Sequence, residues 1–291
     1  LLISNDAGTG TLSSASNNTG LGHEVFDDLT SGDQNTGVGS LALTKLTTGG
    51  NNTGIGTVAL TALTTGGFNT AVGDNSLAAN TTASNNTAVG ASALTANTTA
   101  ADNVALGSNA LLANTTGPRN TALGAFALDA NTTAANNTAV GTSSLGANTT
   151  GASNTAVGKD SLNANTTGSS NVAVGVTTLD ANTTGADNVA MGNGALGANT
   201  TASNNTAIGH EALAANTTGT LNTAVGQNAG AAITTGIRNT TVGAASLDAE
   251  VAGNYSTAMG YGALSVQSSA SGTDVYNTAF GYLAGAAITT G

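Results

Sequence analysis

The side chains with the clearest chemical capacity in this sequence are two histidines, each followed directly by a glutamate. These pairs are His23–Glu24 and His210–Glu211, and three acids follow the first pair at Asp27, Asp28 and Asp33. A histidine beside a carboxylate can bind a metal ion or exchange protons near neutral pH. Paired carboxylates are also the groups that glycosidases use. Whether these residues form a site depends on the elements that would bring them together.

A repeat of 17 residues organises nearly the whole chain. The motif Asn-Thr-Ala-Val-Gly begins at Asn18, recurs at Asn35 and continues at every seventeenth residue as far as Ser256. The last copy begins at Asn277, after four additional residues near 269–274. Such repetition predicts a solenoid in which each copy forms one coil stacked on the next. The motif Asn is position 0 of each coil, and the other positions of the coil are numbered from it.

Three positions of the repeat predict the local structure. Position 4 is glycine in every copy, position 3 is apolar and position 8 is nearly always leucine. We expect a turn at position 4, because glycine serves where φ is positive or backbones pass closely. We predict a strand with positions 1 and 3 facing inward and position 2 outward, and a second strand through positions 8–12. Two central copies contain the representative core and turn residues Val140, Gly141, Leu145, Val157, Gly158 and Leu162.

These patterns predict an all-β protein, a parallel β-solenoid or β-roll with 17-residue coils and two short strands per coil. Every copy contains glycine and several β-branched residues, which disfavours helices. Stacking would bury large apolar side chains, each contributing roughly 1.5–3 kcal/mol. At about 4.8 Å per coil, the predicted rod is roughly 75 Å long. We divide the chain into a lead-in at 1–17, fifteen coils at 18–276 and a final, incomplete coil at 277–291.

Asparagine at position 11 forms a second regular feature. It occurs in nine consecutive copies, from Asn80 to Asn216, and Thr-Thr follows it each time. Stacking predicts ladders of these amides and hydroxyls along the solenoid. The Asn-Thr-Thr units also match the N-glycosylation sequon. A sugar on every coil would crowd its neighbours about 5 Å away, so we interpret these asparagines as ladder residues.

The 17-residue period argues against an active site built from the two His-Glu pairs. The two His-Glu pairs lie eleven coils apart, roughly 50 Å at the strand spacing, and cannot share a site in one chain. No Ser or Thr is placed distinctively beside a histidine base. The sequence contains no phosphate loop, dinucleotide fingerprint or calcium-binding repeat. We therefore expect no enzymatic activity, no cofactor and no metal.

The charge and hydropathy of the chain limit the classes of partner that it can bind. Fifteen acids face four basic residues, giving a formal net charge of −11. So few cations neither neutralise a nucleic-acid backbone nor favour an anionic membrane. Cysteine is absent, and no apolar run approaches the roughly 18 residues of a membrane span. The chain begins at Leu1 without methionine and stops within a repeat, so we expect a processed product or a segment of a longer protein.

Aromatic residues gather at the C-terminal end. All four tyrosines lie in the last two copies, at Tyr255, Tyr261, Tyr276 and Tyr282, and Phe280 lies among them. Because their positions repeat, the tyrosines are expected to stack as two pairs. They could bind a sugar or a receptor, since exposed aromatic residues are common at interfaces. A contact at the end of the solenoid, which shields the last coils or meets another domain, is the interpretation that we favour.

Several units resemble known repeats. Asn171–Gly175 (NVAVG) resembles the β-roll repeats of trimeric autotransporter adhesin heads of the YadA-like type. Asn277–Tyr282 (NTAFGY) and Ile288–Gly291 (ITTG) resemble repeat arrays of phage tail fibres, and the resemblance covers about residues 18–291. It implies a left-handed roll, a homotrimer with one face of each roll at a three-fold axis, and a role in attachment. Adhesin heads have somewhat shorter repeats, and the stalk, anchor and chaperone domains of that family are not recognisable here.

We predict a structural and adhesive fibre segment, the shaft or head of a surface adhesin or phage tail fibre, outside the cell or on a virion. The small residue at position 2 would let copies of a homotrimer approach closely. A cell-surface glycan or protein receptor is the other expected partner, without nucleic acid or membrane insertion. An ice-binding β-solenoid is one alternative, if threonine columns lie on an open face. A self-assembling extracellular filament subunit is another, if unpaired strand edges stack end to end.

Overall fold

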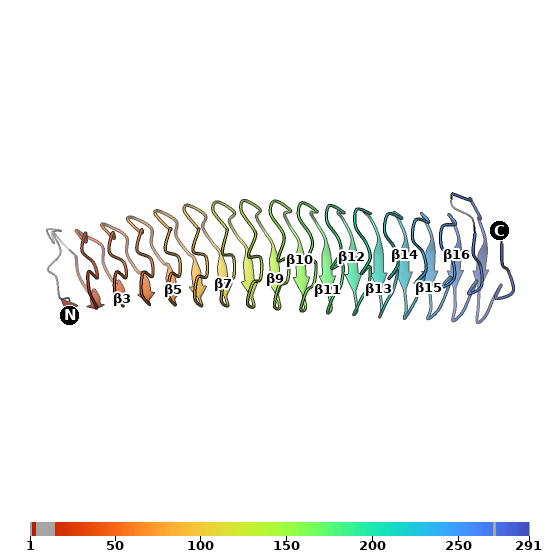
Figure 1. Cartoon of the computed structure of the whole chain (residues 1–291), viewed down its shortest axis with the longest axis horizontal. Helices are drawn as coiled ribbons and strands as arrows, with labels where there is room; N and C mark the ends of the chain where they lie inside the picture. The colour runs from red at the N-terminus through yellow and green to blue at the C-terminus, as the bar shows by residue number, and fades with distance from the viewer. Residues whose placement is uncertain (1, 4–14, 270–271, 291) are drawn as a thin grey trace. The chain divides into compact units, whose positions relative to one another are not determined.

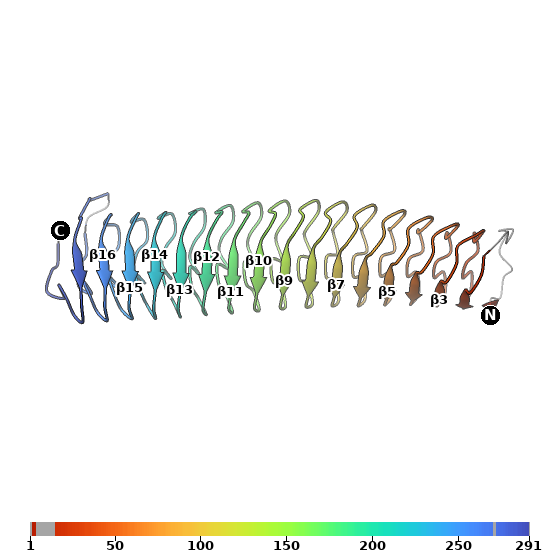
Figure 2. The same ribbon diagram turned by 180° about the vertical axis from the view of Figure 1, so that it is seen from behind.

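The computed structural model describes residues 2–3, 15–269 and 272–290, and it divides into two compact units. The units are Leu1–Ser143 and Ser144–Gly291. Within each unit, one short strand per coil stacks on the next in chain order, as Figures 1 and 2 show from opposite sides. The described residues contain no helix. Each unit is therefore a parallel β-solenoid, as the repeat predicts.

The strands of unit 1 are β1 (Leu2–Ile3), β2 (Thr19–Leu21), β3 (Thr36–Val38), β4 (Thr53–Ile55), β5 (Thr70–Val72), β6 (Thr87–Val89), β7 (Val104–Leu106), β8 (Thr121–Leu123) and β9 (Thr138–Val140). Those of unit 2 are β10 (Thr155–Val157), β11 (Val172–Val174), β12 (Val189–Met191), β13 (Thr206–Ile208), β14 (Thr223–Val225), β15 (Thr240–Val242), β16 (Thr257–Met259) and β17 (Thr278–Phe280). Neighbours within a unit pair in parallel, typically with a register of 17 residues, as Thr36 with Thr53 shows.

The two ends of the repeat depart from this register. β1 pairs with β2, so Leu2–Ile3 already belongs to the stack, although most of the predicted lead-in (residues 1 and 4–14) lies outside the described residues. β16 pairs with β17 through Thr257 and Thr278, a step of 21 residues that spans the insertion. The added residues therefore leave the strand pairing of the last coil intact. Residues 270–271 of the insertion lie outside the described part of the chain.

The second strand predicted for each coil is wrong. Positions 8–12 form turns, because the leucine at position 8 has a positive φ, for example 53° at Leu60 and 51° at Leu94. A left-handed residue cannot continue a β-strand. The turn backbone still bonds from coil to coil, since Leu94 N donates to Ala110 O at 3.0 Å and Ala96 N donates to Leu112 O at 3.1 Å. Hydrogen bonds thus join adjacent coils well beyond the strand.

The predicted facing of the strand is also wrong. The small residue at position 2 points inward, and positions 1 and 3 point outward: Ala71 is fully buried, whereas Thr70 and Val72 are half-buried. The reason is space, because the leucine at position 8 already fills the interior beneath the strand. A Cβ added to Gly54 would lie 3.2 Å from Leu43 Cγ. Only alanine, glycine or, once, Thr241 occupies this position.

The representative core and turn residues also differ in burial, according to their positions in the coil. Leu145 and Leu162 are fully buried, but Val140 and Val157 are only half-buried on the outer side of their strands. Their assignment to the core is therefore corrected. The two glycines at position 4 have φ values of 130° at Gly141 and 135° at Gly158. These values lie in a region that side chains rarely adopt.

Residue sizes at positions 2, 8 and 11 compensate for one another inside each coil. Where position 11 is a buried leucine, as at Leu63, position 2 is glycine, as at Gly54. Where position 8 is Gly230, position 11 is the buried Ile233, whose Cδ1 would lie 2.9 Å from an added Cβ. Most other coils combine alanine, leucine and asparagine. The interior volume is thus kept nearly constant, as close packing requires.

Left-handed non-glycine residues recur at position 6, and two of them, Val58 and Thr177, are β-branched. Val58 has a φ of 63°, a conformation that is a clear outlier for a β-branched side chain. Asn75 and Asn109 occupy the same position in later coils, and asparagine tolerates this region. We expect Val58→Asn to raise the free energy of unfolding by about 0.5–1 kcal/mol in chemical denaturation. Val72→Asn on strand β5 is the matched control and should lower it, and a loss for Val58→Asn would contradict the strain.

Candidate functional site

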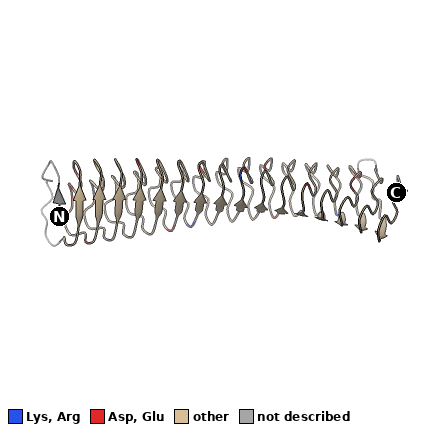
Figure 3. Ribbon diagram, turned by 90° about the horizontal axis from the view of Figure 1, so that it is seen from below, with Lys and Arg blue, Asp and Glu red and all other residues tan. Residues whose placement is uncertain are grey.

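The outer strand face of each unit is the first candidate site, defined as positions 1 and 3 of β2 to β9 in unit 1 and of β10 to β17 in unit 2. Position 1 is threonine except at Val104, Val172 and Val189, and position 3 is always Val, Ile, Leu, Met or Phe. None of these strands contains an acidic or basic residue, and Figure 3 shows the charged residues on the connecting segments. Several position-3 side chains are well exposed, including Leu21 at 52% and Phe280 at 65%. Each unit thus presents an uncharged, partly apolar face.

A ladder of buried asparagines beneath this face holds the strands in register. Position 0 is Asn in nearly every coil, and it is fully buried at Asn52. The Asn52 backbone N and Nδ2 both donate to Asn35 Oδ1, at 2.9 and 3.1 Å, and Nδ2 also donates to Gly66 O at 2.9 Å. The sequence interpretation missed this ladder, although the near-invariant Asn was its signal. Its bonds fix the spacing of the outer side chains.

The predicted ladder at position 11 is confirmed within each unit. Asn182 is fully buried, its Nδ2 donates to Asn165 Oδ1 at 2.9 Å, and its Oδ1 accepts from Asn199 Nδ2 at 2.8 Å. The following threonine adds a second ladder, as Thr183 Oγ1 donates to Thr200 O at 3.0 Å. These asparagines are enclosed, so their Asn-Thr-Thr units cannot carry a sugar in the folded protein.

The aromatic cluster is the second candidate site, defined as Tyr255, Tyr261, Tyr276, Phe280 and Tyr282. The predicted stacking of the tyrosines is confirmed. The ring centroids of Tyr255 and Tyr276 lie 5.2 Å apart, and those of Tyr261 and Tyr282 lie 5.6 Å apart. Phe280, Tyr276 and Tyr282 are mostly exposed. The structure therefore places these five residues on consecutive coils, and Tyr276 bonds to Asp274 of the insertion.

Polar groups extend the first tyrosine pair on both sides. The Arg238 guanidinium lies 5.4 Å from the Tyr255 ring centroid and donates to the Tyr255 hydroxyl. The Tyr276 hydroxyl donates to Asp274 Oδ2 at 3.2 Å. This hydrogen bond, reinforced by the negative charge of Asp274, raises the pKa of Tyr276 because it favours the neutral phenol. Successive contacts thus run from Arg238 to Tyr255, then to Tyr276 and Asp274. They join three consecutive coils at the surface.

The histidine pairs form isolated surface contacts. His23 Nε2 lies 3.6 Å from Glu24 Oε1, and His210 Nδ1 lies 3.8 Å from Glu211 Oε2. Both histidines are about half exposed. No group of three His, Cys, Asp or Glu residues within the described ranges could hold a metal ion. Neither pair therefore supports a proposal of metal or acid-base chemistry.

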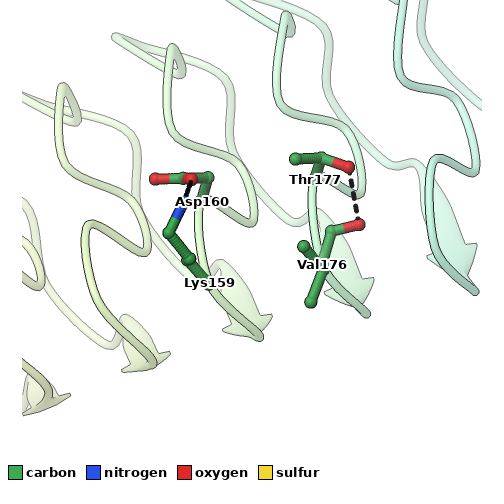
Figure 4. A network of polar contacts seen from close by, with 4 residues as sticks. All are labelled: Lys159, Asp160, Val176 and Thr177. Carbon is green, nitrogen blue, oxygen red and sulfur yellow. Dashed lines mark hydrogen bonds and ion pairs between the residues drawn. The ribbon is translucent and has the colours of Figure 1, made fainter.

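The turn after each strand carries variable surface residues. Figure 4 shows Lys159 paired with Asp160 in one coil, and Thr177 Oγ1 donating to Val176 O at 2.8 Å in the next. An exposed ion pair of this kind contributes little to stability. The nearby Asp180 carboxyl has a raised pKa, chiefly because burial disfavours its charge and secondarily because Asp160 repels it. The residues of these two contacts therefore lie at the surface or only partly below it.

Glu250 is a fully buried acid that the sequence interpretation did not single out. It replaces asparagine at position 11, and its Oε1 accepts from the backbone N of Val251, Ala252 and Gly253 at 2.7–3.1 Å. Gln267 Nε2 donates to Oε2 at 2.9 Å, and Ser269 donates to both oxygens. Glu250 thus ties the start of the insertion to the preceding coil.

The Glu250 carboxylate should make unit 2 less stable in acid. Burial raises its pKa, but the hydrogen bonds from Gln267, Gly253, Ser269 and Ala252 outweigh burial and leave the pKa below its ordinary value of 4.5. A lowered folded pKa means that this stabilisation is present above the unfolded pKa and is lost as pH falls through the folded one. Glu250→Gln should cost about 2 kcal/mol near pH 7, with the difference from wild type shrinking below about pH 4.

Chemical denaturation of wild type and Glu250→Gln between pH 3 and pH 7 measures this difference. Subtracting the free energies of unfolding of the two proteins cancels the contribution of acids that both contain. Asp129 and Asp248 are examples, and burial raises the pKa of each. A constant gap between the two stability curves at every pH would contradict the role of the ionised carboxylate.

Comparison with known proteins leaves the family of the chain open. No protein-family model matches the sequence, and no curated protein matches it. Neither comparison therefore gives a family. The part of the chain that the structure describes also supplies no membrane-spanning helix. The function must therefore be argued from the outer strand face and the aromatic cluster.

Proposed function

We propose that this chain is a structural, adhesive segment of an extracellular fibre, the shaft or head of a surface adhesin or phage tail fibre. The observation that carries the proposal is the outer strand face of each unit, which repeats without a charged residue in β2 to β9 and in β10 to β17. Large uncharged and partly apolar surfaces mark contacts with other macromolecules. A face that recurs coil after coil suits a lateral contact along a fibre better than a local ligand site.

The cohesion of the coils supports a mechanical role. Strand, turn and asparagine ladders all bond from coil to coil, and a buried Asn at position 0 or position 11 typically bonds to the Asn at the same position of the neighbouring coil. Buried polar networks with satisfied members hold one defined arrangement. Stability in such repeats adds up over coils and their interfaces. A fibre segment needs this kind of distributed resistance to unfolding.

A homotrimer is the assembly that we propose, with the outer strand faces turned toward one another. Position 2 cannot make the contact predicted from the sequence, since its alanines are buried inside each coil. Positions 1 and 3 take that role instead. The chain has a formal net charge of −11, so copies meet with least repulsion through their uncharged strands. Burial of the position-3 side chains would stabilise the contact.

The native mass in solution tests this assembly. We expect a mass near three chains for wild type and a mass near one chain for Ile208→Lys, which places a charge on the outer strand face. Val176→Lys is the matched control, because Val176 is 43% exposed in a turn and Ile208 is 38% exposed in β13. The control should keep the wild-type mass. A wild-type monomer at micromolar concentration would overturn the trimer.

Ice binding is a second candidate, and the outward threonines at position 1 favour it. They form a column of hydroxyl and methyl groups on short parallel strands in each unit, as at Thr206 and Thr223. The neighbouring position 3 varies from valine to Met191 and Phe280, which makes the face uneven and counts against this function. A monomer that retards ice growth would support ice binding over the fibre. Unaltered ice growth in a thermal-hysteresis assay would exclude it.

A further inference from the structure

We propose that the two stacked tyrosine pairs are sites of oxidative cross-linking, at which dityrosine bonds join adjacent coils of one chain. All four tyrosines of the chain belong to these pairs, Tyr255 with Tyr276 and Tyr261 with Tyr282. The oxidant that we expect is a haem peroxidase acting with hydrogen peroxide. Because the bonds form within one chain, the inference does not depend on the assembly proposed above.

Each pair holds two phenol rings in contact. The ring centroids lie 5.2 Å apart in the first pair and 5.6 Å apart in the second, with interplanar angles of 20° and 13°. Hydrogen bonds between coils fix the backbone nearby, since Val275 N donates to Asn254 O at 3.1 Å and Leu283 N donates to Tyr261 O at 2.9 Å. Holding two reactive groups together makes their coupling effectively unimolecular. Coupling within a pair is therefore favoured over coupling between chains.

The reaction at each pair removes two electrons and two protons. Each phenol loses one electron and its hydroxyl proton, and the two phenoxyl radicals form a bond between one Cε carbon of each ring. These two carbons then lose their hydrogens as protons, and both oxygens regain a proton, which restores the phenols. Hydrogen peroxide accepts two electrons and two protons through the peroxidase, and its O–O bond breaks to give two waters.

The first pair has a base placed for this reaction. The Tyr276 hydroxyl donates to Asp274 Oδ2 at 3.2 Å, and Asn254 Nδ2 holds the other carboxylate oxygen at 3.0 Å. A phenol that has lost an electron is a strong acid, so its proton passes to Asp274 along this hydrogen bond. The Arg238 guanidinium lies 5.4 Å from the Tyr255 ring centroid, and its charge opposes electron loss there. Oxidation of this pair therefore begins at Tyr276.

The second pair is open to solvent. Tyr261 is 56% exposed although Tyr282 of the following coil stacks on it, so an oxidant reaches the edge of the ring. Within the described part of the chain, neither hydroxyl of this pair has a carboxylate partner like Asp274. Its protons must pass to water. The two pairs thus share one geometry but differ in the group that accepts the proton.

The first pair also spans the interruption of the repeat. Tyr255 and Tyr276 lie 21 residues apart, like the paired Thr257 and Thr278, and the segment between them contains the insertion. The chain has no cysteine, so a disulfide cannot close this segment. A covalent link across it would remove freedom mainly from the unfolded chain. We therefore expect cross-linking to stabilise the last coils against unfolding.

Intact-mass measurement after treatment with a haem peroxidase and hydrogen peroxide tests the proposal. Wild type at high dilution should lose four hydrogens, two for each pair, gain the fluorescence of dityrosine and remain a single chain in denaturing electrophoresis. Tyr276→Phe and Tyr282→Phe each keep two aromatic rings in the affected pair but remove one hydroxyl, so each variant should lose only two hydrogens. The double variant should lose none. Asp274→Asn should slow coupling of the first pair several-fold and leave the second pair unchanged.

Three outcomes would overturn the proposal or part of it. If treated wild type keeps its mass, or forms only cross-links between chains, the stacked pairs are not coupling sites. If wild type unfolded in denaturant couples as fast as the folded protein, the stacking does not direct the reaction. If Asp274→Asn couples at the wild-type rate at both pairs, water takes the proton and the role given to Asp274 is wrong.

Discussion

Gly56→Ala is expected to unfold part of unit 1, with a loss of about 4 kcal/mol or more. Gly56 has a φ of 136°, which strains any residue with a side chain by about 1–3 kcal/mol. An added Cβ would also lie 2.4 Å from Gly73 O in the next coil. Gly73 cannot move away freely, because its N donates to Ile55 O at 2.7 Å. Backbone strain and steric overlap with Gly73 therefore both destabilise the variant. They act at a point where hydrogen bonds join the two coils.

Gly50→Ala is the matched control for this prediction. Gly50 lies at position 15 of the preceding coil, where Ala101 stands in a later coil, and an added Cβ would lie 3.1 Å from Asp33 O. We expect a loss below about 1 kcal/mol, the usual range for a substitution without a special mechanism. Chemical denaturation and limited proteolysis of both variants provide the measurement. Equal stability of Gly56→Ala and Gly50→Ala would refute the role assigned to position 4.

The stacking of coils was predictable because it depends on the period of the repeat alone. A glycine that recurs in every copy marks a backbone conformation that other residues avoid, and Gly141 and Gly158 adopt it. The tyrosine pairs were predictable for the same reason, since residues 21 positions apart across the insertion occupy equivalent places. These inferences need no knowledge of which way a side chain points.

The facing of the strand was not predictable from alternation. Alternation in Thr-Ala-Val defines two faces but does not say which is inside. Assigning the larger residues to the core is the usual choice, and it failed because Leu145 and its equivalents fill the interior. The left-handed φ of these leucines has no sequence signal, since leucine rarely adopts it. That conformation also removed the second predicted strand.

The candidate functional residues also differed in how far the sequence could predict their surroundings. The aromatic cluster was visible as a cluster, and its position in the repeat placed it correctly on consecutive coils. Its relation to the outer strand face was hidden, because that face was assigned to the core. Glu250 was hidden as well, since an acid at an asparagine position is typical of a surface substitution. Only the enclosing N–H groups of 251–253 and Ser269 reveal why a buried charge is tolerated.

Asn182→Asp is expected to be the most damaging near-isosteric substitution in unit 2, with a loss of about 4 kcal/mol or more near pH 7. The Asn182 amide donates to Asn165 Oδ1 and to Gly185 O, at 2.9 and 3.0 Å. A carboxylate at this place would face these two acceptors with no donor of its own. The side chain is fully buried, so water cannot relieve the repulsion. Asn193→Asp, in an exposed turn, is the control and should be nearly neutral.

Two further measurements distinguish charge repulsion from a general loss of packing at Asn182. Burial raises the pKa of an aspartate in this column, so the deficit of Asn182→Asp should shrink as pH falls toward the unfolded pKa. Asn182→Leu combined with Ala173→Gly, which reproduces the pairing of Leu63 with Gly54, should cost less, about 2–3 kcal/mol at every pH, because the leucine is then accommodated but Asn165 and Gly185 each lose a donor. If both variants lost the same stability with no dependence on pH, the ladder would act through its shape alone, and its hydrogen bonds would not be what selects asparagine there.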